Sequence, residues 1–404
     1  MNSKKRILFV DDEEMILEVL RRMLRPLTNE WELSFAADGD EALALMEQAP
    51  YDVVVSDMRM PGLNGAELLS EVMKRYPRTQ RLIHSGYADR ELILQCVGST
   101  HQYLAKPCTV ETLRGVLRRA AALDDSLGSE TLKQLLGRLD RLPSIPALYV
   151  ELVQKLQNPE VDLDDVAAVI SKDMAMTAKM LKLVNSAFFG LQCEVNTPAE
   201  AASYLGLDTI KSLVLSIQVF SQFEDAHVPG FSLDHVWPHS LQTAMAARAV
   251  AQAALGDRKI SDESFVAGLL HDAGKLLLAA HLGPKYAEAL RLVASGQRAP
   301  LDAEREVLGG HHGEVGGYLF GLWGLPLPVV EAVTMHHTPR LCPEPAFSPL
   351  TAVHVADVIV HENAGSRRAG SKPAVDMEYL ESLGMADQFG DWKTLWSPSA
   401  ESVR

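Results

Sequence analysis

The stretch Tyr51-Asp-Val-Val-Val-Ser-Asp-Met-Arg-Met-Pro-Gly62 decides the fold of the N-terminal third of this chain. Its apolar run Val53–Ser56 stops at the carboxylate Asp57 and is followed by a segment with Pro61 and Gly62. A short apolar run of this kind, rich in β-branched residues, is typical of a buried strand. We therefore expect a strand here, with Asp57 at its carboxyl end.

Similar apolar runs lie on both sides of this one and alternate with helical patterns. The other runs are 7–10, 33–36, 81–84 and 102–104, and the helical patterns are 15–24, 41–48, 66–76, 90–97 and 110–122. Five strands alternating with five helices predict an α/β fold, a doubly wound five-stranded parallel sheet covered on both faces. Ligands in such folds bind at the carboxyl ends of the strands.

Composition limits the classes of protein that this chain can belong to. Its 404 residues suggest two or three domains, and 47% hydrophobic with 23% charged residues fits soluble globular cores. The net charge of −15 argues against direct DNA binding, because phosphate neutralisation needs clustered Lys and Arg. The four cysteines lack metal-ligand spacing, and no apolar run suits a signal peptide or a membrane span. We expect a cytoplasmic protein that does not enter the membrane.

Polar side chains gather where the predicted strands end. Asp11 and Asp12 follow the first strand, Asp57 ends the third, Ser85 follows the fourth, and Lys106 follows the fifth. Clustered carboxylates favour a hard cation such as Mg²⁺, and a lysine can take a phosphoryl oxygen. A carboxylate nucleophile would then form an acyl phosphate on Asp57. One such Asp alone could be a helix cap, but the whole set at strand ends predicts a phosphoryl-transfer site.

These residues resemble the response-regulator receiver family across residues 1–122. The matching motifs are Val10-Asp11-Asp12, Ser56-Asp57-Met-Arg-Met-Pro-Gly62, Ser85-Gly86 and Tyr103-Leu-Ala-Lys106-Pro107. The resemblance implies that Asp57 is the phosphoacceptor and that Asp12, Asp57 and the backbone carbonyl of Arg59 hold Mg²⁺, with Asp11 assisting. It also implies that Ser85 and Lys106 bind phosphoryl oxygens, that Tyr103 is a switch residue, and that Lys106–Pro107 is a candidate cis peptide.

The pattern changes beyond the first domain. Residues 123–134 are polar and read as a linker or a connecting helix, and residues 135–396 carry helical periodicity, for example in Leu163–Ile170 and Ser240–Ala254. We expect an all-helical second domain.

Histidines and aspartates are the chemically informative residues of that domain. The candidates are His239, His271, Asp272, His312, His336, His337 and Asp357, with Lys275 as a candidate catalytic residue. Adjacent imidazole and carboxylate groups, joined by distant ones, can hold divalent transition metals for phosphoester hydrolysis. For His227, His281 and His361 we expect ordinary hydrogen-bonded or solvated imidazoles.

The second domain resembles the HD superfamily and more closely its HDOD branch. The motifs are Leu142-Pro-Ser-Ile-Pro146, Ser171-Lys-Asp173, Leu181-Lys-Leu-Val-Asn-Ser-Ala187, Ala201 to Leu205-Gly-Leu207, Trp323-Gly-Leu-Pro326 and His336-His337. HDOD domains are regarded as regulatory modules, whereas the related HD-GYP branch hydrolyses cyclic di-GMP at a metal cluster. Thr338-Pro339-Arg340 follows His336-His337, without the acidic residue and Gly-Tyr-Pro motif of the hydrolytic branch.

Three functional interpretations remain open. In the first, a sensor histidine kinase phosphorylates Asp57, and the helical domain signals to an unknown downstream protein through protein contacts, with a homodimer as an option. In the second, the receiver gates a metal-dependent cyclic di-GMP phosphodiesterase. A third, weaker reading is a receptor whose histidine-lined cavity only binds a nucleotide.

Overall fold

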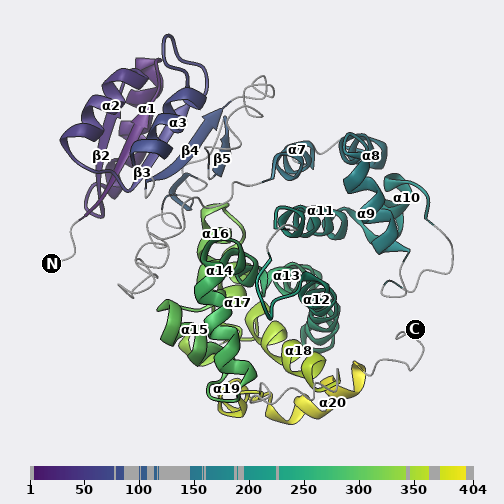
Figure 1. The fold of residues 1–404 in the computed structure, drawn as a ribbon. Coiled ribbons are helices and arrows are strands. Elements are labelled where there is room, and N and C mark those ends of the chain that lie inside the picture. Colours follow the sequence, from purple (N-terminus) through teal and green to yellow (C-terminus); the bar gives the residue numbers. More distant parts are fainter. Residues whose placement is uncertain are drawn as a thin grey trace. The chain divides into compact units, whose positions relative to one another are not determined.

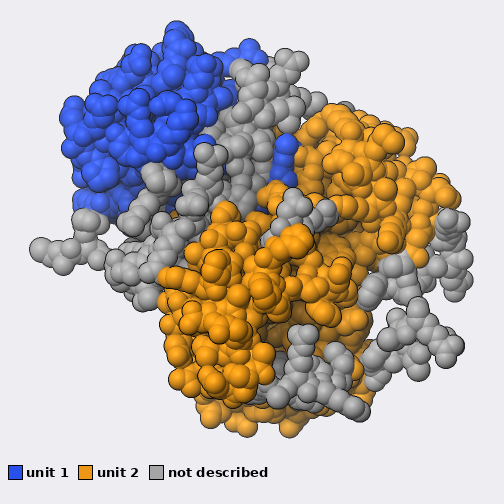
Figure 2. Space-filling view, in the orientation of Figure 1, with its two compact units in different colours: residues 1–128, 141–147, 319–325 blue, residues 129–140, 148–318, 326–404 orange. Residues whose placement is uncertain are grey.

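The computed structural model shows a parallel sheet followed by a helical region (Figure 1). It describes residues 4–76, 79–85, 100, 102–106, 113–115, 117, 146–156, 158, 161–185, 189, 195–223, 227–342, 346–363 and 374–396. The chain divides into two compact units (Figure 2). The first unit is residues 1–128 with 141–147 and 319–325, and the second is residues 129–140, 148–318 and 326–404.

The first unit contains the five-stranded parallel sheet predicted from the sequence. The strands are β1 (Lys5–Val10), β2 (Trp31–Ala36), β3 (Val53–Asp57), β4 (Gln80–Ser85) and β5 (Gln102–Ala105). Their order is β2-β1-β3-β4-β5, and every neighbouring pair is parallel. Because the order reverses at β1 and β3, their carboxyl ends form the crevice where this fold binds ligands. The fold class expected from the sequence is confirmed.

Helices cover both faces of this sheet, as its buried strands require. The helices are α1 (Glu14–Leu24), α2 (Gly39–Gln48) and α3 (Gly65–Arg75). Leu17, Leu20 and Leu24 of α1 pack in one core with Ile7 and Phe9 of β1. The helix α2 contacts β1 and β2, and α3 contacts β3 and β4. Side chains alternate along a strand, so Leu8 and Val10 bury on the opposite face. Each predicted strand and each of these three helices begins and ends within two residues of the observed bounds.

Several sequence predictions fall outside the described residues. These are the helix at 90–97, most of the helix at 110–122, the linker at 123–134, and Gly86 and Pro107. The backbones of Ser85 and Tyr103 lie in β4 and β5, but their side chains are outside the described part as well.

The second unit is helical in its described residues, as expected. The helices of the chain beyond residue 146 are α7 (Ala147–Leu156), α8 (Leu163–Ile170), α9 (Met174–Val184), α10 (Pro198–Leu205), α11 (Leu207–Ser221), α12 (Leu233–Leu255), α13 (Arg258–Leu270), α14 (Ala273–Ala294), α15 (Pro300–Leu308), α16 (His312–Leu322), α17 (Leu327–Met335), α18 (Pro349–Asn363), α19 (Met377–Ser382) and α20 (Phe389–Leu395). The helices α12, α13, α17 and α18 pack on one another, and α8 to α11 form a second group that joins them through α11 and α13. Figure 1 shows α12, α13, α17 and α18 gathered side by side.

The helical stretch Arg258–Ala294, formed by α13 and α14, is long and apolar enough to cross a membrane by length and composition. However, 78% of its most apolar window is buried inside the protein. Such burial is typical of core helices in soluble domains, where apolar side chains on all sides contact other helices.

A close approach of α14 to the start of α16 depends on one glycine. A Cβ atom added at Gly274 would overlap the backbone carbonyl of His312. We expect Gly274→Ala to lower the free energy of unfolding of the helical domain by about 3 kcal/mol, because backbone must move to admit the methyl group. Gly390→Ala in α20 is the control, since nothing lies within 4 Å of its added Cβ. Urea denaturation of both variants tests this, and equal stability of the two would contradict it.

Candidate functional sites

The carboxyl ends of β1 and β3 carry a buried and a partly buried carboxylate, Asp11 and Asp57, that share one ammonium group. Asp11 is 3% exposed, and Lys106 Nζ donates to Asp11 Oδ2 at 2.8 Å and also to Asp57 Oδ1. The second carboxylate oxygen of Asp57 accepts from the backbone N–H of Arg59 at 2.6 Å. The exposed Asp12 follows Asp11 directly in the chain. The prediction that Asp11, Asp57 and Lys106 meet is therefore confirmed by the structure.

Burial controls the charges of this group. It raises the pKa of Asp57, and Lys106 offsets this only in part. Burial also acts to lower the pKa of Lys106, but hydrogen bonds to Asp11 and Asp57 outweigh it, so the net shift is upward. Lys106 thus stays cationic between the carboxylates, where its ammonium group can donate to an additional anionic group.

Two carboxylates beside an exposed third one fit a hard cation that keeps several waters. In the described part of the chain, the carboxylate oxygens of Asp11, Asp12 and Asp57 do not all lie within 4.8 Å of one another. The donor chemistry fits Mg²⁺ held by one or two carboxylates, a carbonyl oxygen and waters.

The candidate residues of the helical unit come from five separate segments of the chain, and their side chains lie close together. His239 lies on α12, His271 and Asp272 join α13 to α14, and Asp357 lies on α18. His239 Nε2 is 2.9 Å from Asp357 Oδ1 and 3.3 Å from His271 Nε2. His271 Nε2 is 3.5 Å from Asp272 Oδ2. The expectation that these four side chains converge is confirmed, and scattered imidazoles are excluded.

The remaining candidates line the same cluster. His312 Nε2 lies 3.3 Å from Asp272 Oδ1 and 3.1 Å from His337 Nε2. The ring of His336 lies between those of His271 and His312, at centroid distances of 5.0 and 5.5 Å. Lys275 Nζ donates to Asp272 Oδ2 at 2.6 Å. We call these eight residues, seven metal-ligand candidates and Lys275, the His/Asp cluster.

Backbone carbonyls orient two of these imidazoles. Nδ1 of His271 donates to the carbonyl of Gly268 at 2.8 Å, and Nδ1 of His336 donates to that of Val333 at 2.9 Å. A carbonyl only accepts, so the proton lies on Nδ1 and each neutral ring turns an Nε2 lone pair toward the cluster. Burial keeps both rings neutral: it lowers the pKa of His271 to about 4 and holds that of His336 well below its usual range.

The two carboxylates of the cluster remain ionised although burial alone would protonate them. His271 and Lys275 hold the pKa of Asp272 well below its usual range, and His361 and His239 do so for Asp357. His336 Nε2 is buried and has no hydrogen-bond partner in the described part of the chain. The buried Asp272 Oδ1 and Asp357 Oδ1 face imidazole nitrogens of His312 and His239 at 3.3 and 2.9 Å. Buried polar atoms normally have partners, so the unpaired Nε2 atom of His336 fits a bound cation. The neutral imidazoles of His271 and His336, together with two ionised carboxylates, are donors that suit a first-row divalent metal.

Two residues beside the His/Asp cluster were not predicted from the sequence to belong to this site. Glu304 on α15 is 5% exposed and accepts from both the backbone N–H and Nδ1 of His312, each at 2.8 Å. Burial acts to lower the pKa of His312, but Glu304 and Asp272 raise it to about 9. His361, expected to be an ordinary imidazole, places Nδ1 2.9 Å from Asp357 Oδ1. The spacing of four residues between Asp357 and His361, in a region predicted to be helical, was a sequence signal for this contact. No sequence signal pointed to Glu304.

Comparisons with known proteins agree with this architecture. The family model of the response regulator receiver domain matches residues 7–118 of this chain, and the family model of the HDOD domain matches residues 142–339. The chain is 24% identical to an HDOD domain protein of unknown function from Geobacter sulfurreducens, with a TM-score of 0.52 and coverage of 68% of this chain and 90% of that one.

Two curated relatives are similar over part of their length. One is an uncharacterised protein of Treponema pallidum, 28% identical over 60% of this chain and 47% of its own. The other is the hydrogenase transcriptional regulatory protein HoxA of Cupriavidus necator, 39% identical over 38% of this chain and 31% of its own. The chain thus spans less than half of the length of either relative. It belongs to the proteins that join a response-regulator receiver domain to an HDOD domain.

Proposed function

We propose that this chain is a two-component response regulator in which phosphorylation of Asp57 controls the HDOD domain. The observation that carries the proposal is the placement of Asp57 at the end of β3, with Lys106 bonded to both Asp57 and Asp11. A sensor histidine kinase would supply the phosphoryl group, and the domain would act on a downstream protein by contact in the cytoplasm. We also propose that the chain can form a homodimer.

The phosphorylation step uses groups that already surround Asp57. A carboxylate oxygen of Asp57 attacks the phosphorus, the donor leaves, and an acyl phosphate forms. Asp12, Asp57 and the carbonyl of Arg59, with Asp11 assisting, would hold Mg²⁺, which neutralises phosphoryl charge when bound. Lys106 can then transfer its hydrogen bond from Asp57 to a phosphoryl oxygen. In this proposal Ser85 takes another oxygen, and Tyr103 reports the change at β5.

The regulatory part of the proposal predicts a change far from the phosphate. With Mg²⁺ and acetyl phosphate, amide hydrogen exchange in residues 146–396 of the full chain should change by at least about twofold at several helices, since a signal must alter the output domain. Asp57→Asn should remove that change. Exchange that differs only within residues 4–117 would contradict control of the HDOD domain.

A second candidate function is a metal-dependent phosphodiesterase acting on cyclic di-GMP, and the His/Asp cluster favours it. His239, His271, Asp272, His312, His336, His337 and Asp357 would hold the metals, and Lys275 would contact the substrate. A bound metal would polarise a phosphoryl oxygen and activate water. Thr338-Pro339-Arg340 stands where the hydrolytic branch has its acidic residue and Gly-Tyr-Pro motif, and we therefore rank this function below the first.

A further inference from the structure

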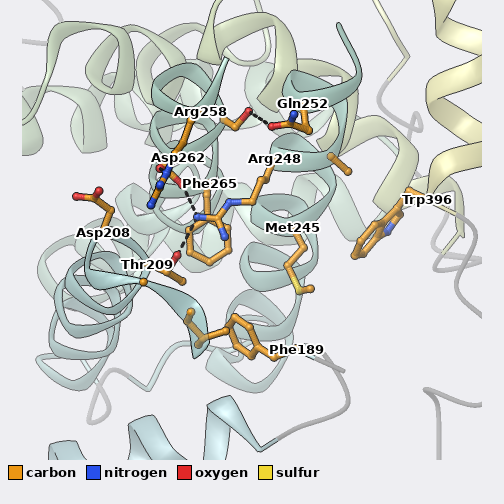
Figure 3. A pocket seen from close by; sticks show the side chains of 14 residues that line it. Phe189, Asp208, Thr209, Met245, Arg248, Gln252, Arg258, Asp262, Phe265 and Trp396 are labelled. Carbon is orange, nitrogen blue, oxygen red and sulfur yellow. Dashed lines mark hydrogen bonds and ion pairs between the residues drawn. The ribbon is translucent and has the colours of Figure 1, made fainter. Parts of the chain in front are cut away.

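A second pocket in the helical unit lies apart from the residues of the His/Asp cluster. It has a volume of about 530 Å³, within the range of small-molecule sites. Its walls come from the start of α11, from α12 and α13, and from Phe189 and Trp396 (Figure 3). No residue of the His/Asp cluster lines it.

An arginine held in a fixed position stands at the centre of this pocket. The guanidinium of Arg248 lies over the ring of Phe265 at 4.1 Å, and its Nη2 donates to Asp262 at 2.8 Å and to Thr209 at 3.1 Å (Figure 3). Its Nε is buried without a hydrogen-bond partner in the described chain. About a third of the side chain remains exposed. A guanidinium ordered in this way offers N–H groups to an anion at little entropic cost.

Next to Arg248, the N-terminus of α11 opens into the pocket. This 15-residue helix starts after Gly206, which has φ of 80° and provides no side-chain cap. Leu207, Asp208 and Thr209 therefore leave first-turn N–H groups without a capping side chain, and such groups attract anions. A Cβ at Gly206 would lie 3.8 Å from Arg258 Nη2, so this second guanidinium reaches the helix start.

The carboxylates of the pocket are already paired. Asp262 lies 2.8 Å from Arg248 and 3.6 Å from Arg258, and Asp208 lies 3.3 Å from Lys211. Among the residues that line the pocket, two arginines balance two carboxylates, and Lys211, outside the lining, pairs with Asp208. The uncapped helix start adds positive potential to this neutral set, so the site suits an anion although the whole chain is acidic.

Much of the remaining wall is apolar and aromatic, with Gln252 and Ser261 as polar members. Phe189, Met245 and Trp396 line it, and the carbonyl of Trp396 is held by Asn363 at 2.8 Å. Aromatic side chains offer flat surfaces on which planar rings stack. We propose that this pocket binds a small molecule that joins a planar aromatic ring to a phosphate, a nucleoside monophosphate being the simplest example. The phosphate lies at Arg248, Arg258 and the start of α11, and the ring lies against Trp396. The proposal is independent of phosphorylation at Asp57.

Calorimetric titration of the full chain with AMP and GMP tests this site, with adenosine and inorganic phosphate as separate probes. Because the pocket engages both parts of the molecule, at least one nucleotide should bind about tenfold more tightly than either probe. The titrations contain EDTA and are repeated with His271→Ala, so that binding at the His/Asp cluster is recognised.

Two variants test the location of the site. Arg258→Gln should weaken nucleotide binding about fivefold, and Trp396→Leu about tenfold. Lys259→Gln is the matched control: it removes one charge from the next position of α13, where Lys259 is 82% exposed and, like Arg258, pairs with an acid four residues on. Unfolding midpoints of Arg258→Gln and Lys259→Gln, two positions that are 84% and 82% exposed, should agree with the wild type.

Four results would overturn the proposal. They are absence of nucleotide binding, phosphate binding as tight as nucleotide binding, equal weakening by Lys259→Gln and Arg258→Gln, and loss of binding in His271→Ala alone. The last result would place the nucleotide at the His/Asp cluster.

Discussion

Labelling of this chain by acetyl phosphate and Mg²⁺ is expected to fall below detection in the Asp57→Asn variant. An amide has nearly the shape of a carboxylate but cannot form the acyl phosphate, so the fold should persist while the chemistry stops. Asp57 is the only carboxylate of the described chain that both ends a strand of the sheet and bonds to Lys106. Radiolabel incorporation or the added mass of the intact chain measures the effect.

Asp38→Asn provides the matched control for this experiment. Asp38 caps α2 by accepting from the N–H of Glu41 at 2.8 Å, and asparagine is an equally good cap. It should therefore be labelled at the wild-type rate. Label that persists in Asp57→Asn at an unchanged rate would contradict the assignment of the phosphoacceptor.

The His/Asp cluster is expected to hold a first-row divalent metal, and His239→Ala should lose at least about tenfold of the affinity. His239 contributes an imidazole nitrogen 2.9 Å from Asp357 and 3.3 Å from His271, so its removal leaves a gap in the donor set. Metal–ligand distances of about 2.0–2.3 Å are expected in the loaded protein. Elemental analysis after dialysis against Mn²⁺ or Zn²⁺ measures the content.

His235→Ala is the control for metal binding. His235 is exposed and lies one turn before His239 on α12, so the two variants remove the same group from one helix. Retention of metal in both variants, or its absence from the wild type, would contradict the metal site.

The same preparations separate the two candidate functions. With metal bound, we expect no hydrolysis of cyclic di-GMP above the rate of the buffer, since retained ligands without a substrate-positioning shell do not suffice for turnover. Hydrolysis that disappears in His239→Ala would instead establish the phosphodiesterase.

Local sequence patterns determined most of the first domain. Each buried strand is a short apolar run, and parallel strands bring their carboxyl ends to one edge, so the neighbourhood of Asp11, Asp57 and Lys106 followed from the order of the strands. Asn64 and Glu67 form a capping box at the start of α3, a signal that depends on neighbours in sequence alone. These features could be predicted because their physical causes are local or repeat along the strand.

In the second domain, the sequence determined the helices and the residue types of the site, and only the tertiary structure decided where the side chains meet. His239, His271 and Asp357 lie far apart in sequence, and they converge because α12, α13 and α18 pack on one another. The roles of Glu304 and of Gly274 depend on contacts with a helix that starts at His312, and no local pattern encodes such contacts. Likewise, the pocket of Arg248 exists only because the start of α11, α12, α13 and Trp396 enclose one space. Helix periodicity specifies which face is buried, but the partner that covers this face is chosen by packing across the whole domain.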